Sequence, residues 1–135
     1  MTVAIESEGR GVMSIRLTGG TSTDNAGLGQ VANPEGVPVL ILRSTLVVLA
    51  PSSGAANLSA GIGAAGAAAT DIINVLAMNG VAANTAYNGH AMQNTAKTAI
   101  TAPALWTTDK FITFTGSAST AGLDARLLVE YARIN

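Results

Sequence analysis

The chain has 135 residues, of which 48 % are apolar, 4 % aromatic and 11 % charged, and its formal net charge is −1 at neutral pH. The length favours one domain that can bury a hydrophobic core, and the near-neutral charge argues against nucleic acid or an anionic membrane as a partner. The absence of cysteine excludes disulfides and thiolate chemistry. Since few charges are available to solvate the surface, we expect much of it to be covered by copies of the chain or by a larger assembly.

Neither a signal peptide nor a membrane span is expected. The first residues, MTVAIESEGRG, have no basic start followed by an apolar run. Residues 44–70 carry no charge, but they contain APSSGAANLS, which is too polar for the core of a bilayer.

The first half of the chain predicts strands separated by turns. VMSIRL at residues 12–17 alternates between an apolar face of Met13, Ile15 and Leu17 and a polar face of Ser14 and Arg16, which indicates a half-buried strand. A glycine-rich loop over 18–30 and a turn at ANPEG follow. Residues 37–51, VPVLILRSTLVVLAP, predict a long central strand bent near Arg43, because the run is β-branched and is bounded by prolines. After a turn at SSGAAN, NLSAGIG over 57–63 predicts a shorter strand.

The second half contains the one candidate helix. ATDIINVLAMNG at 69–80 predicts a short helix capped by Thr70 or Asp71 and ended at Asn79–Gly80, although a loop or a strand remains possible. Residues 81–104 are expected to be irregular, with a hairpin-like YNGH.

Two further strands complete the chain. Residues 105–119, LWTTDKFITFTGSAS, predict a strand in which Phe111, Thr113 and Thr115 oppose Ile112 and Phe114. The last stretch, 121–135, alternates cleanly: Ala125, Leu127, Val129 and Tyr131 face inward, and Asp124, Arg126 and Glu130 face outward. We expect this strand to lie inside a sheet. Several short strands with Gly, Ser, Asn and Pro turns predict an all-β sandwich or barrel with at most one short helix.

The stretch GIGAAG at 61–66 spells the G-x-G-x-x-G fingerprint of dinucleotide-binding proteins. That mechanism needs a strand before the motif, a helix after it and an acidic residue about 20 positions later. No Asp or Glu occurs from Ile72 to Thr108. We therefore interpret the glycines as positions where the backbone turns tightly or where a neighbouring subunit approaches closely, and predict no nucleotide cofactor.

The remaining candidate residues do not predict catalysis. His90 is the only histidine, and it lacks the partners of a triad or a zinc site. The carboxylates are interpreted as turn caps and solvated edges: Glu6, Glu8, Asp24, Glu35, Asp71, Asp109, Asp124 and Glu130. The large side chains Trp106, Phe111, Phe114 and Tyr131 are assigned to the core. The sequon NLS at 57–59 is taken as coincidental. We predict no catalytic residues, no metal and no enzymatic activity.

Four segments resemble small virion structural proteins of tailed bacteriophages. They are GLGQVANPEGVPVLILRSTLVV, PSSGAANLSAGIGAAGAAATDIINVL, YNGHAMQNTAKTAITAPALWTTDKFITFTGSAST and GLDARLLVEYARIN. Those relatives with known roles are head decoration, or cement, proteins. The resemblance implies a jelly-roll sandwich over residues 27–135, with residues 1–26 as an N-terminal arm or an added strand.

The resemblance also implies a function and partners. It predicts a homotrimer made in the host cytoplasm that binds the major capsid protein on the outer surface of the head and clamps neighbouring capsomers. The N-terminal segment would reach to the capsid or to a neighbouring subunit. The alternative is a trimeric fibre or receptor-binding domain of the virion, which the scarcity of Trp and Tyr disfavours.

Overall fold

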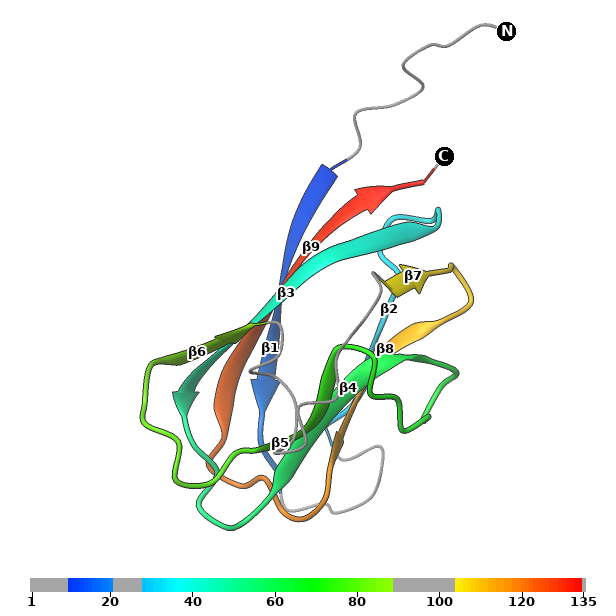
Figure 1. The fold of residues 1–135 in the computed structure, drawn as a ribbon. Coiled ribbons are helices and arrows are strands. Elements are labelled where there is room, and N and C mark those ends of the chain that lie inside the picture. Colours follow the sequence, from blue (N-terminus) through cyan, green and yellow to red (C-terminus); the bar gives the residue numbers. More distant parts are fainter. Residues whose placement is uncertain (1–9, 21–27, 89–103, 135) are drawn as a thin grey trace, which may run out of the picture.

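The computed structural model describes residues 10–20, 28–88 and 104–134, and these form two antiparallel sheets packed into a sandwich (Figure 1). This confirms the predicted all-β sandwich. The described residues contain no helix, and accordingly none that could span a bilayer.

Each sheet has a path of four strands. The first follows the order β1-β9-β3-β6, with the short β7 also paired to β3. Its strands are β1 (Arg10–Thr18), β9 (Asp124–Arg133), β3 (Val39–Ala50), β6 (Thr85–Asn88) and β7 (Ala104–Trp106). The second follows β2-β8-β4-β5, with β2 (Gln30–Ala32), β8 (Phe111–Gly116), β4 (Asn57–Gly63) and β5 (Ile73–Ala77).

The strand pairs are nested along the chain. β1 pairs with β9, β2 with β8, β3 with β6, and β4 with β5. The first half of the chain therefore lies antiparallel to the second half, and the chain turns back between β4 and β5. The pairs alternate between the sheets: β1–β9 and β3–β6 belong to the first, and β2–β8 and β4–β5 to the second. The folded-back chain therefore encloses one core between the two sheets.

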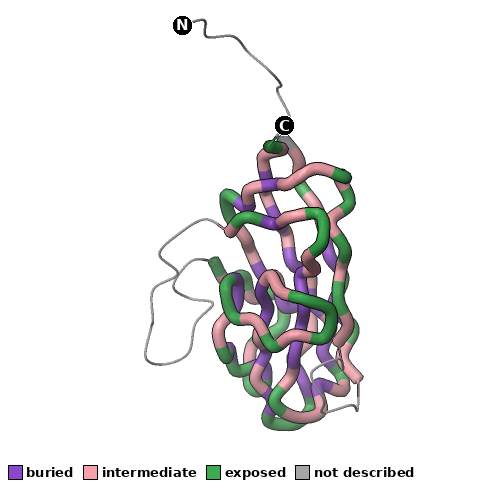
Figure 2. Tube along the Cα trace, turned by 90° about the vertical axis from the view of Figure 1, so that its right-hand side faces the viewer, coloured by how far each residue is buried: buried purple, intermediate pink, exposed green. Residues whose placement is uncertain are grey.

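The alternation read from the sequence places the core correctly. Along β9 the four residues expected to face inward are buried, and β9 lies between β1 and β3 as expected of an internal strand. Ile15 and Leu17 of β1 are buried on the same side. Figure 2 shows buried segments along the middle of the molecule and exposed ones at its turns. The largest fully buried side chains are Trp106, Phe114, Leu46, Leu58, Ile73, Met78, Ile112, Leu123 and Leu127.

The bend predicted near Arg43 is a β-bulge. The register between β3 and β9 shifts between Ile41 and Arg43, so that Leu42 is an extra residue without a partner on β9. A bulge bends a strand and interrupts its alternation, and as a result both Leu42 and Arg43 are exposed.

The predicted helix at 69–80 is wrong, because β5 occupies its centre. A second bulge explains the error. β5 has one more residue than β4 between two paired positions, and Val75 lies there with a φ of 55°. The extra residue separates the buried Ile73 and Leu76 by three positions, which is the spacing of one helical face.

Two other predictions need correction. The strand expected over 105–119 is divided into β7 and β8 by a turn, in which the Lys110 amide donates to the Thr107 carbonyl at 3.2 Å. Within the segment expected to be irregular, residues 85–88 form β6.

The hairpin-like Gly89–His90 lies outside the described residues. Of the proposed arm over 1–26, residues 10–18 form β1, while 1–9 and 21–26 are outside the described part.

Candidate interaction surface

The glycines of GIGAAG serve close packing. A Cβ atom on Gly61 would lie 2.6 Å from the amide nitrogen of Asp71 and 2.8 Å from the carbonyl carbon of Ala69. The motif ends β4 and leads through a turn, with Gly66 at a φ of 73°, to strand β5. The fingerprint has a helix N-terminus directly after the motif, whereas here a turn leads to a strand, as the tight-turn interpretation predicts. The close approach at Gly61 is to another segment of the same chain.

The carboxylates in the described ranges lie at separate places in the fold. Within these ranges, no three His, Asp or Glu side chains gather as a metal site would require. Asp71 accepts a hydrogen bond from the Ile62 amide at 3.1 Å, and Asp109 accepts one from Thr107 at 2.6 Å in the turn before β8. The Thr107 hydrogen bond lowers the pKa of Asp109. Glu6, Glu8, Asp24 and His90 lie outside the described residues.

Three of the four aromatic candidates belong to the core, as predicted, but Phe111 does not. Trp106 is fully buried and its indole nitrogen donates to the Lys110 carbonyl at 2.9 Å. Phe114 and Tyr131 are also buried, and Phe111 is half-buried. None of these rings forms an exposed stacking surface.

The surface feature that stands out is a cluster of exposed apolar side chains. Among the described residues, five large apolar side chains are exposed. Four of them lie at one end of the first sheet, on β1, β3 and β7 and just after β9: Val12 (68 % exposed), Leu42 (42 %), Leu105 (54 %) and Ile134 (45 %). The fifth, Val75, lies on β5 in the other sheet.

The strand register places these side chains on one outer face. Leu40 is opposite both Leu105 on β7 and Ala132 on β9, and side chains at opposed positions share a face. Their chain neighbours Val39, Ile41, Trp106 and Tyr131 are buried on the inner side. We call the set Val12, Leu40, Leu42, Leu105, Ala132 and Ile134 the apolar face.

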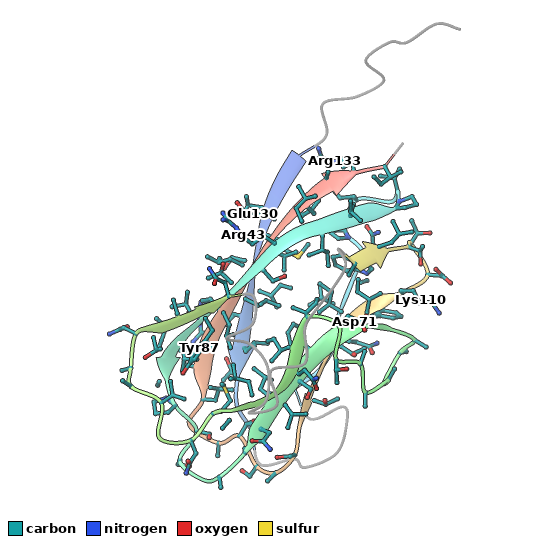
Figure 3. The ribbon with its side chains drawn as sticks, in the orientation of Figure 1. Arg43, Asp71, Tyr87, Lys110, Glu130 and Arg133 are labelled. Carbon is teal, nitrogen blue, oxygen red and sulfur yellow. The ribbon has the colours of Figure 1, made fainter. Side chains whose placement is uncertain are left out.

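An ion pair lies within the apolar face. Arg43 and Glu130 are opposed on β3 and β9, and their Nε and Oε2 atoms are 2.5 Å apart. Figure 3 shows both on the side of the sheet that points away from the second sheet. The hydrogen bond from Arg43 to Glu130 raises the pKa of the guanidinium. These residues line a surface hollow together with Gly11, Val12, Leu42 and Tyr131.

Charge increases toward the other end of the same face. Asp124 lies 2.6 Å from Arg126 Nη1 and 3.8 Å from Arg16 Nε. One carboxylate is therefore shared by two guanidinium groups. The outer face of the first sheet thus has an apolar end and a charged end, which is the pattern of a contact surface with a polar border.

A part-buried polar cluster on the inner side of the first sheet supports its apolar end. Glu35 accepts hydrogen bonds from the Tyr131 hydroxyl at 2.5 Å and from Arg133 Nε at 2.6 Å. The bonds from Arg133 and then Tyr131 lower the pKa of Glu35, and the bond to Glu35 raises the pKa of Tyr131. In the same turn, Asn33 donates to the carbonyls of Val37 and Trp106 at 3.0 Å each.

This cluster was missed by sequence reasoning, which interpreted Glu35 as a turn residue and Tyr131 as core. The two residues are 96 positions apart, and no local spacing indicates such a contact. The proline and glycine of ANPEG predict the turn, but only the pairing of β9 with β3 brings Tyr131 and Arg133 to it.

Comparison of the chain with protein-family models, with curated proteins and with solved structures finds no match.

Proposed function

We propose that this protein is a structural component of a tailed-phage virion that binds the outer surface of the head and clamps neighbouring capsomers. The observation that carries the proposal is the apolar face, where four of the five large apolar side chains exposed in the described part of the chain gather. It indicates that the chain works in an assembly with other protein chains, as copies of a decoration protein do on a shell. Monomeric proteins seldom leave such side chains together, and clustered ones mark sites of protein contact. The proposed action is therefore adhesion between surfaces, without chemistry on a substrate.

The strand pairing supports the family resemblance behind this proposal. Leaving β7 aside, four nested pairs join eight strands in two sheets. A jelly roll is built from eight antiparallel strands in two sheets, and we infer that this sandwich is one. The inference is consistent with a head decoration protein as well as with other virion sandwiches.

The proposed stabilisation of the shell depends on many identical contacts on one particle. One weak contact between a small sandwich and a shell adds little free energy, but many identical contacts on one particle act together against internal pressure. An oligomer of the chain would strengthen each attachment, because several copies would engage several capsomers at once.

The direct test is to count this chain against the shell protein in purified virions. A decoration protein should be present at a fixed ratio to the shell protein, with roughly hundreds of copies per particle, since each equivalent site is filled. A few copies per particle would contradict the proposal and favour the fibre or receptor-binding alternative. Absence of the chain from the particles would exclude both functions.

A further inference from the structure

We infer that the apolar face is where the protein packs against a second copy of itself, and that it is not the surface applied to the shell. The inference rests on the proposed function, in which copies of the chain associate, and it assigns a location to that contact. It concerns Val12, Leu40, Leu42, Leu105, Ala132 and Ile134, with the Arg43–Glu130 pair among them.

The charge pattern of this face is complementary to itself. Arg43 and Glu130 lie side by side on β3 and β9, and their side chains are 65 % and 40 % exposed. When the same face of a second copy is applied across a symmetry axis between them, each Arg43 meets the other copy's Glu130. The opposite charges of this pair cancel each other, so that the pair itself does not make two identical faces repel each other.

The arrangement of the rest of the sheet fits a contact between copies. Beyond the apolar end, Arg16, Asp124 and Arg126 form a charged border that can remain solvated. Val12 lies on β1, whose outer edge has no partner strand among the described residues. Charges on edge strands usually prevent association. In β1 the exposed Arg16 lies at the charged end, whereas the apolar end carries Val12, the most exposed large apolar side chain of the described residues.

The decisive experiment changes single exposed residues and measures the association of purified protein by sedimentation velocity. Val12→Lys and Leu105→Lys place a charge on the apolar face, and Val75→Lys places the same charge on the second sheet. We expect the wild-type chain to be oligomeric and each variant on the apolar face to dissociate at least about tenfold more readily, a change of about 1.4 kcal/mol. Val75→Lys should associate as the wild type does.

A second pair of variants tests directly whether the apolar face contacts the same face of a second copy. Because the chain has no cysteine, Leu42→Cys introduces one thiol into the apolar face and Val75→Cys one outside it. We expect mild oxidation to link Leu42→Cys chains to each other and to leave Val75→Cys chains unlinked, since a disulfide forms only between close Cβ atoms. Far-UV circular dichroism of each variant checks that the sheets are intact.

Three results would overturn the inference. They are a wild-type chain that remains monomeric at high concentration, variants on the apolar face that associate and bind shells as the wild type does, and variants that associate normally but no longer bind shells. The last result would give the apolar face to the shell protein. It would leave the proposed function standing, whereas a chain that is absent from virions would remove that function without changing the solution measurements.

Discussion

Gly61 shows how a single residue fixes the local fold. The backbone of residues 69–71 lies so close to it that a Cβ atom would approach the Asp71 amide nitrogen to 2.6 Å. Backbone cannot move aside as a flexible side chain can. The position therefore requires glycine for packing, whatever the surrounding motif resembles.

We predict that Gly61→Ala lowers the free energy of unfolding by about 1–3 kcal/mol, as overpacking of a tight site usually does. Gly54→Ala is the matched control, because a Cβ atom there has no neighbour within 4 Å. It should change stability by no more than about 1 kcal/mol. Urea unfolding followed by Trp106 fluorescence measures both variants, and equal effects would contradict the close-approach account.

Glu35 makes stability depend on pH at the acid end. Its pKa in the folded chain lies below the ordinary value of 4.5 because the ionised carboxylate accepts hydrogen bonds from Arg133 and Tyr131. The unfolded chain binds a proton at higher pH than the folded chain does. The stabilisation is therefore complete above pH 4.5 and is lost as the pH falls through the folded pKa.

We accordingly predict that Glu35→Gln is less stable than the wild type at neutral pH and that the difference shrinks as the pH is lowered below 4.5. Tyr131→Phe removes one of the two hydrogen bonds but keeps the ring that covers Gly11, so it should have a smaller effect. Urea unfolding over a pH series measures this. A constant difference across the acid range would show that Glu35 does not titrate as described.

Among the elements, β9 depends most directly on its sequence pattern. It lies between β1 and β3, and its residues alternate between the core and the outer face. Leu127 is fully buried opposite Ile15 and Leu46, whereas the adjacent Leu128 is half-buried on the outer face.

We predict that Leu127→Ala costs about 2–5 kcal/mol of stability, because it removes buried apolar surface and leaves a cavity. Leu128→Ala should cost less than about 1 kcal/mol, as a substitution outside the core. Both are measured by urea unfolding at the same chain concentration, since association would add to stability. A larger loss for Leu128→Ala would mean that the strand faces are assigned the wrong way round.

Sequence reasoning placed β1, β3, β4 and β9 correctly, with β4 at the predicted residues 57–63. β1 and β9 alternate without a break, and β3 was recognised by its β-branched run. The error at β5 has a physical cause: a bulge at Val75 shifts the buried positions to a helix-like spacing. Bulges depend on the partner strand, which a local pattern does not contain.

For the molecule as a whole, the sequence predicted a sandwich and a covered surface, but not where the exposed apolar residues gather. Val12, Leu42 and Leu105 come from three separate segments and meet only through strand pairing. The cluster around Glu35 was hidden for the same reason. The unusual composition, with 11 % charged residues, indicated contact with other molecules, while the fold identifies the surface available for it.

We propose that this protein acts by laying its surface against a viral shell, and heating particles with and without the protein tests this action. Virions that lack the chain should rupture at a lower temperature than complete ones. Adding purified protein back should restore the rupture temperature and saturate at the ratio found in complete particles. Particles that neither bind the added protein nor change their rupture temperature would contradict the claim.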